Sequence, residues 1–207
     1  MIYPKKNKLI YGFFRFYIPW IIRRNFYTVN FNPVVINPDK AVLLLANHFG
    51  WWDAFLLYDV FRKLTDKKLY VMVIEDTMQR EWAIKYIGAF SVNKKPREII
   101  ASLAYATTLL ADPKNLVLIF PQGKLYSNLV NEVHFEKGII KIIDQAKDKF
   151  QLIYATTFIE NFQHKKPTAN IYLSANTNCT FEDIKAITGS YQQHYNTSRQ
   201  QQTKIVL

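Results

Sequence analysis

The stretch AVLLLANHFGWWD (residues 41–53) decides how the rest of this chain is interpreted. Six apolar or small residues run into a polar group, and the apolar sequence AFLL follows it. A short apolar run that ends at a Gly-containing turn indicates a buried strand that passes into a helix. Polar side chains that are buried without partners cost a few kcal/mol. Asn47, His48 and Asp53 are therefore expected either to satisfy one another or to perform chemistry.

Apolar runs and helical patterns alternate outward from this stretch. Five further runs are predicted to be strands: 69–74, 89–92, 115–120, 152–158 and 170–175. Apolar residues recur with the period of an amphipathic helix at 52–64, 97–111 and 136–147. A last helix is predicted near 181–195 from a capping box at its start. Apolar strands that alternate with helices indicate a sheet with helices on both faces. We therefore predict an α/β fold with a mixed, largely parallel central sheet.

The charge distribution singles out the N-terminal segment. The net charge is +11, which favours an acidic partner, and the chain has no Asp or Glu before Asp39. The run IYGFFRFYIPWII (10–22) is apolar and aromatic, is flanked by Lys and Arg, and is interrupted by Arg15 and Pro19. As a helix it would be roughly 20 Å long, which is short of the ~30 Å hydrocarbon core of a bilayer.

This pattern is typical of a helix that lies in the headgroup region of an anionic membrane surface. We therefore predict a membrane-associating segment at 1–30, followed by one domain at 31–207. The alternative is a helix that packs on the protein's own core. The single Cys fits a reducing compartment, so the predicted location is the cytoplasmic face of the cell membrane, with peripheral attachment.

Polar residues follow the first predicted strand in an order that suits catalysis. His48 lies in the turn and Asp53 in the first turn of the next helix, so the carboxylate can fold back onto the imidazole. Asp53 would then fix the tautomer of His48 and leave the other ring nitrogen as a general base. The alternative is that Asp53 has no catalytic role and only stabilises the helix N-terminus through its negative charge.

Two more strand ends carry residues suited to ligand binding. The strand at 115–120 runs into PQGK, and the strand at 89–92 runs into NKK. Ligands of open α/β sheets bind at the carboxyl ends of the strands, Gly permits close backbone approach, and Lys supplies a cation. The predicted substrate-binding residues are Asn93, Lys94, Pro121, Gln122, Gly123 and Lys124. Glu75 and Asp76 follow a further strand and are interpreted as solvated or capping residues, with a place in the site as the alternative.

Together these segments resemble the glycerol-phosphate and lysophosphatidic acid acyltransferase superfamily. NHFGWWD (47–53) is similar to its NHxxxxD block, GAFSVNKK (88–95) to its second block, and FPQGK (120–124) to its FPEGTR block. FEKG (135–138) is similar to the segment that follows. The blocks occur in the family's order and cover about residues 41–160.

The resemblance implies acyl transfer to a hydroxyl without a metal, a cofactor or a covalent acyl-enzyme. The donor would be acyl-CoA or acyl-carrier protein, and the acceptor a lysophospholipid, glycerol phosphate or related lipid of phospholipid biosynthesis. His48 would be the general base, Asp53 its orienter, and the turn at 121–124 part of the acceptor site. The remaining His residues, His134, His164 and His194, show no ligand spacing, which also argues against a metal site.

The sequence departs from the family pattern at four positions. Gln122 stands where the family usually has Glu, Lys94 where it has Arg, and Lys124-Leu125 where it has Thr-Arg. Arg grips phosphate with two hydrogen bonds, whereas Lys acts as a point charge. A non-phosphate acceptor such as a glycolipid, a lipoamino acid or a pigment is therefore an alternative.

Two non-enzymatic classes also fit parts of the sequence. A non-catalytic lipid-binding protein would keep the fold and the basic N-terminus, but the paired His48 and Asp53 argue against it. A nucleic-acid binder would use the net charge, but the chain has no recognisable nucleic-acid motif and its N-terminal cations interleave with membrane-type aromatics. We therefore expect no nucleic-acid partner.

Overall fold

The computed structural model describes residues 1–93, 95–176 and 181–206. The strands are β1 (Thr28–Phe31), β2 (Ala41–Ala46), β3 (Lys68–Ile74), β4 (Ala89–Val92), β5 (Asn115–Ile119), β6 (Phe150–Glu160) and β7 (Thr168–Asn176). The α-helices are α1 (Lys8–Asn25), α2 (Asp53–Leu64), α3 (Glu75–Arg80), α4 (Pro96–Leu109), α5 (Gly138–Ala146) and α6 (Ile184–Gln202). Short 3₁₀ helices lie at Trp82–Ile87 and Lys147–Lys149.

The described strands form one seven-stranded sheet in the order β1-β7-β6-β2-β5-β3-β4. Neighbouring strands are parallel except for β6 and β7, which pair antiparallel. The predicted fold class, a mixed and largely parallel sheet with flanking helices, is confirmed. The central strands β2 and β5 are buried along their whole length, because helices cover both faces of the sheet.

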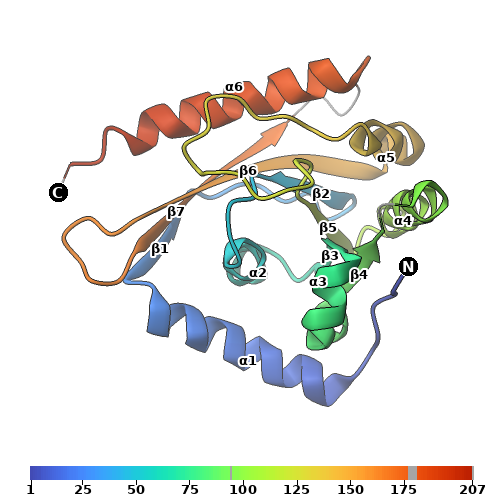
Figure 1. Cartoon of the computed structure of the whole chain (residues 1–207), viewed down its shortest axis with the longest axis horizontal. Helices are drawn as coiled ribbons and strands as arrows, with labels where there is room; N and C mark the ends of the chain where they lie inside the picture. Colours follow the sequence, from blue (N-terminus) through green and yellow to red (C-terminus); the bar gives the residue numbers. More distant parts are fainter. Residues whose placement is uncertain (94, 177–180, 207) are drawn as a thin grey trace.

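Helices lie on both faces of the sheet (Figure 1), and an apolar core fills the space on each face. On one face, α1 and α2 pack on the side chains of Val42, Leu44 and their neighbours. On the other face, α4, α5 and α6 pack on the alternate residues, such as Leu43 and Leu45. Successive residues of a strand point to opposite faces, so a single apolar run such as AVLLLA supplies both cores.

Helix α1 has a buried face and an exposed face. Ile18 and Ile22 are buried in the core beside α2, whereas several aromatic and aliphatic side chains on the other side are open to solvent. Asn7 caps the helix, because its side-chain oxygen accepts hydrogen bonds from the backbone of Leu9 and Ile10. Among the described residues, no helix is long and apolar enough to cross a bilayer. The division of the chain at residue 30 stays a prediction.

The segment before α1 is tied to the far edge of the sheet. Ser91 of β4 donates its backbone N–H to the carbonyl oxygen of Ile2 at 2.9 Å. The backbone N–H of Ile2 in turn donates to the Ser91 side-chain oxygen at 2.6 Å. Beyond α1, β1 pairs with β7 at the opposite edge. Helix α1 therefore runs beneath the sheet and is fixed at both ends (Figure 1).

Candidate active site

Two turns meet at the carboxyl edge of the sheet. Strand β2 ends at Ala46, and a turn leads to α2, which begins at Asp53. Strand β5 ends at Ile119, and a second turn follows it. Because β2 and β5 are adjacent and parallel, the segment 47–52, here called the histidine turn, lies beside the segment 120–126, here called the PQG turn.

The two acid–base residues predicted from the sequence contact each other. The Nδ1 atom of His48 lies 2.7 Å from Oδ2 of Asp53. The same Oδ2 accepts the backbone N–H groups of Phe49 at 2.8 Å and Gly50 at 3.0 Å. An ionised carboxylate only accepts hydrogen bonds, so Nδ1 donates and the lone pair of the neutral ring sits on Nε2. Asp53 thereby fixes the tautomer that a general base needs.

The burial of the pair differs between its two members. The Asp53 side chain is 2% exposed, whereas that of His48 is 28% exposed. The second carboxylate oxygen, Oδ1, is buried and has no hydrogen-bond partner among the described residues. A negative charge that is buried away from water interacts more strongly with an adjacent imidazolium than an exposed one does. The histidine is therefore accessible to a substrate, while the group that orients it is shielded from water.

The PQG turn makes the other contacts that hold His48 in place. The ring of His48 stacks on that of Phe120, with centroids 4.3 Å apart and planes 19° apart. The backbone N–H of His48 donates to Oε1 of Gln122 at 2.8 Å, and its carbonyl oxygen accepts from the backbone N–H of Tyr126 at 2.9 Å. The ring and both backbone polar groups of His48 are thus engaged by one neighbouring turn.

The four residues of PQGK have different exposures. Pro121 and Gln122 are buried, whereas Gly123 and Lys124 are exposed. Gly123 has φ +65°, a left-handed conformation that glycine adopts readily. A Cβ at this position would lie 3.0 Å from Cγ of Glu136. The positive φ therefore favours glycine, and a Cβ here would also require the exposed Glu136 side chain to shift by a few tenths of an ångström. Lys124 lies at the surface beside Gly123.

The FEKG segment contacts the PQG turn through a backbone hydrogen bond. The N–H of Glu136 donates to the carbonyl oxygen of Pro121 at 2.7 Å. Three segments that are similar to family blocks, NHFGWWD, FPQGK and FEKG, are thus brought together in space.

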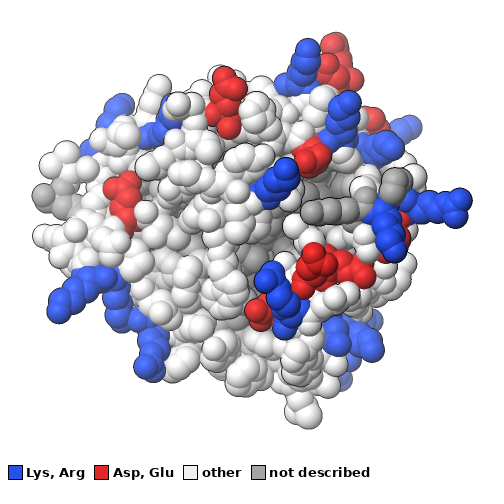
Figure 2. All heavy atoms as spheres, viewed as in Figure 1, with Lys and Arg blue, Asp and Glu red and all other residues white. Residues whose placement is uncertain are grey.

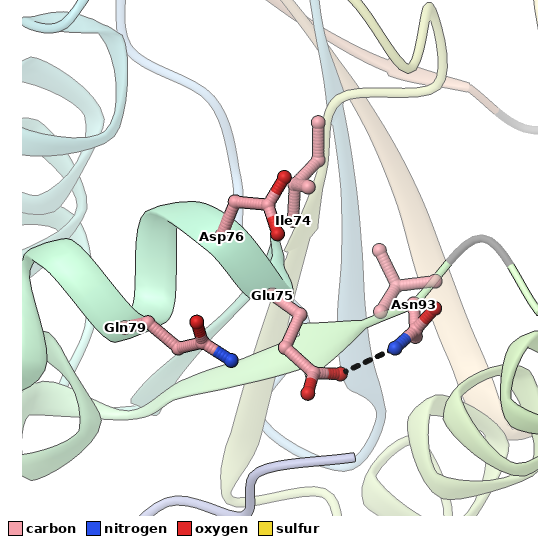
Figure 3. Close-up of a pocket in the computed structure, with 6 residues that line it drawn as sticks. Ile74, Glu75, Asp76, Gln79 and Asn93 are labelled. Carbon is pink, nitrogen blue, oxygen red and sulfur yellow. Dashed lines mark hydrogen bonds between the residues drawn. The ribbon is translucent and has the colours of Figure 1, made fainter.

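The third predicted strand end lies farther along the same edge. Asn93 follows β4 and donates its side-chain amide to Oε2 of Glu75 at 3.1 Å. Lys94 lies outside the described residues. A cavity of ≈ 150 Å³ opens here, and it is lined by Ile74, Glu75, Asp76, Gln79, Val92 and Asn93. Figure 3 shows Glu75 and Asn93 pointing toward each other across this pocket.

Two of these lining residues were predicted mainly as solvated or capping residues. Glu75 and Asp76 begin α3 and line the pocket. Gln79 was missed, because α3 is a six-residue helix without an apolar stripe that the sequence could reveal. Among the described residues, no three His, Cys, Asp or Glu side chains could hold a metal ion together.

Asn47, the first polar residue of the opening stretch, lies inside the sheet. It is 5% exposed, and its side chain makes two hydrogen bonds with the backbone of Thr157 in β6. Close by, the buried Tyr191 of α6 donates its hydroxyl to the carbonyl oxygen of Ala155 at 2.7 Å, and burial raises the pKa of that hydroxyl. Asn47 therefore anchors the start of the histidine turn to β6.

Comparisons with known proteins agree with this geometry. Residues 27–159 match the protein family described as Acyltransferase, a span of more than half of the chain. No curated protein matches the chain. Among solved structures, the chain is similar to the crystal structure of the 1-acyl-sn-glycerophosphate (LPA) acyltransferase PlsC from Thermotoga maritima. That match has a TM-score of 0.62 and 14% sequence identity and covers 96% of this chain and 80% of the other, so it shows a shared fold.

Proposed function

This chain belongs to the acyltransferase family, and on that premise we propose that it transfers a fatty acyl group from a thioester donor to a hydroxyl of a membrane lipid. The donor is acyl-CoA or acyl-carrier protein. The acceptor is a lysophospholipid, glycerol phosphate or related lipid, which places the reaction in phospholipid biosynthesis. The observation that carries the proposal is the 2.7 Å contact between His48 Nδ1 and Asp53 Oδ2.

The proposed reaction needs one base and no covalent intermediate. The acceptor hydroxyl oxygen attacks the thioester carbonyl carbon while Nε2 of His48 takes the hydroxyl proton. The resulting imidazolium is stabilised by the carboxylate of Asp53. When the tetrahedral intermediate collapses, the C–S bond breaks and the thiolate takes the proton from Nε2. An ester and a free thiol are formed, and His48 returns to its starting state.

The PQG turn and the Asn93 pocket form the proposed substrate-binding region. Lys124 is exposed on the PQG turn, the same turn that contacts His48, and we assign it to phosphate groups of the donor or acceptor, together with Lys94. Pro121, Gln122 and Gly123 shape the wall of the site, and Asn93 lines the pocket farther along the edge. Incubation with labelled palmitoyl-CoA and a total lipid extract tests the proposal, because the lipid that gains label identifies the acceptor.

An acceptor without phosphate is the second candidate. Two carboxylates, those of Glu75 and Asp76, line the pocket that contains Asn93, and Glu136 packs against Gly123. Figure 2 shows acidic as well as basic side chains gathered to the right of the hollow in this face. Carboxylates repel phosphate but accept hydrogen bonds from hydroxyl or ammonium groups. Label in a glycolipid or an aminolipid, with none in phosphatidic acid, would favour this candidate.

We further propose that α1 holds the protein on the cytoplasmic face of the cell membrane. Its outward side chains are large and apolar, and those of Leu9, Phe13, Phe16 and Trp20 are exposed. Basic residues accompany them, and the guanidinium of Arg24 lies 5.4 Å from the centre of the Trp20 ring. Apolar insertion combined with attraction to anionic lipid is the usual basis of interfacial attachment. This placement would bring the lipid acceptor to the enzyme without its leaving the bilayer.

A further inference from the structure

The histidine turn directs three successive backbone N–H groups inward. Those of Phe49 and Gly50 donate to Oδ2 of Asp53, and that of His48 donates to Oε1 of Gln122 at 2.8 Å. The conformation of the turn is therefore fixed by two side chains from different elements. Asp53 holds its second half from α2, and Gln122 holds its first half from the turn after β5.

Gln122 is itself immobilised. Its side chain is 3% exposed, and the residue before it, Pro121, has a fixed φ and accepts a backbone hydrogen bond from Glu136. Of the three residues of the PQG turn that contact His48, Phe120 contributes its ring and Tyr126 its backbone N–H. Gln122 contributes the polar side chain, so this contact depends on the identity of the residue.

We infer that Gln122 is a positioning residue for the proposed acyl transfer. Its carbonyl oxygen fixes the backbone of His48, and so the direction in which Nε2 faces the acceptor hydroxyl, without touching the reacting atoms. The inference rests on the proposed function and assigns the Gln122 side chain to His48 rather than to the substrate. Displacing a reacting group by about 1 Å can cost about a hundredfold in rate, so the loss of this contact should appear in kcat.

Two substitutions distinguish the need for an oxygen acceptor at this position from the need to fill its volume, because both new side chains have about the length of Gln. Gln122→Glu keeps an oxygen at the place of Oε1, and a carboxylate accepts the His48 N–H at least as well as an amide does. Gln122→Met fills the same space but offers no comparable acceptor, which leaves the His48 N–H unpaired. If the role is positioning, the Glu variant rescues what the Met variant loses.

The kinetic test uses labelled palmitoyl-CoA with a total lipid extract as the source of acceptor. We expect Gln122→Met to lower kcat roughly tenfold to a hundredfold and to change the KM for palmitoyl-CoA less than about threefold. Gln122→Glu should stay within about fivefold of wild type in kcat. A raised KM with unchanged kcat in the Met variant would assign Gln122 to the substrate and overturn the inference.

A second measurement needs no substrate. Amide hydrogen exchange followed by NMR reports the protection of each backbone N–H separately. Gln122→Met should accelerate exchange of the His48 amide at least about tenfold and leave most of the protection of the Phe49 and Gly50 amides, which Asp53 holds. An unchanged His48 amide would refute the inference. A wild-type enzyme that transfers no acyl group would instead refute the proposed function, so the two failures are distinguishable.

Gln192 of α6 offers a matched control. Its Oε1 accepts the backbone N–H of Val133 at 2.7 Å, which is the same kind of contact in a different part of the molecule. Gln192→Met should accelerate exchange of the Val133 amide and leave kcat within about twofold of wild type. If Gln192→Met lowered kcat as much as Gln122→Met, the effect would be a general loss of packing, and the inference would be wrong.

Discussion

The side chain of Asn47 and the backbone of Thr157 form two hydrogen bonds that continue the pairing of β2 with β6 beyond the end of β2. The Thr157 N–H donates to Oδ1 of Asn47 at 2.9 Å, and Nδ2 of Asn47 donates to the Thr157 carbonyl oxygen at 3.1 Å. Both residues are buried. The histidine turn thus starts from a point that is fixed to the centre of the sheet.

Asn47→Ala should therefore act chiefly on stability. The substitution leaves a buried N–H and a buried C=O of Thr157 without these partners, at a cost of about 1–3 kcal/mol for each unsatisfied group. We expect a lower urea midpoint with an unchanged slope. Asn161→Ala is the control, because Asn161 bonds a backbone carbonyl in an exposed loop and its loss should cost less than about 0.5 kcal/mol. Equal midpoints for Asn47→Ala and wild type would contradict the anchoring role.

Much of the fold could be predicted from the sequence because the central strands are buried on both faces. A strand such as AVLLLA is then apolar throughout, and the amphipathic helices between the strands are long enough to show their period. Strand β1 was missed because its four residues, TVNF, are only partly buried at a sheet edge. The helices at 75–80 and 82–87 were missed because they are short and their position depends on β3 and β4.

The sequence could predict only those parts of the site that lie in the turns after strands. The pairing of His48 with Asp53 followed from their places in a turn and a helix start, and the structure brings them to 2.7 Å. The sequence could not show that Gln122 faces the His48 backbone or that Asn47 pairs with Thr157. Such contacts join residues more than 70 positions apart, and they depend on strand order and side-chain direction, which no local pattern encodes.

Removal of the Lys124 charge should weaken substrate binding. Lys124→Met is expected to raise the KM for palmitoyl-CoA about threefold to tenfold, because an exposed ion pair contributes about 1 kcal/mol. The same change at Lys94 should have a similar effect, and folding should be unaffected in both variants. Lys114→Met is the control, because Lys114 is exposed just before β5, at the opposite edge of the sheet. Unchanged kinetics in both variants would assign Lys94 and Lys124 to the solvated surface.

Attachment through α1 can be measured by flotation with lipid vesicles. Phe16 is 77% exposed on this helix, and Phe16→Glu should lower binding to phosphatidylglycerol-containing vesicles at least about fivefold, because a charge replaces an inserting ring. Ile100→Glu is the control, since Ile100 is exposed on α4, which covers the opposite face of the sheet.

Two observations would contradict peripheral attachment. Washing with high salt or carbonate should release the protein from membranes, and retention after both treatments would indicate a spanning segment. A DNA retention assay under the same salt conditions should show no binding. Tight salt-sensitive binding to DNA together with no vesicle binding would reassign the positive charge to a nucleic-acid partner.

His194 should make the protein sensitive to mild acid. Burial lowers the pKa of its imidazole from the ordinary 6.5 to about 4, so between these values the unfolded chain binds a proton that the folded chain does not. The stability that the neutral ring contributes is full above pH 6.5 and is lost as the pH falls toward 4, at no more than about 1.4 kcal/mol per pH unit. His194→Gln should flatten this loss in urea unfolding measured at several pH values.

The control for His194 is His134, whose side chain is 71% exposed. His134→Gln should leave the dependence of unfolding free energy on pH unchanged. The comparison uses the difference between pH 7 and pH 4.5 within each variant, so a uniform loss of stability in His194→Gln does not affect it. An equal loss in wild type and His194→Gln would show that the ring does not cause the acid sensitivity.

The central claim is that His48 takes the proton of the acceptor hydroxyl and that Asp53 orients it. The most direct measurement is acyl transfer from labelled palmitoyl-CoA to lipid extract by His48→Ala, Asp53→Asn and the double variant, each verified as folded by circular dichroism and thermal unfolding. Each single variant should lose about 10²–10⁴-fold in rate, and the double variant should be little worse, because the two groups act as a unit. A folded His48→Ala variant that transferred acyl groups at nearly the wild-type rate would contradict the mechanism.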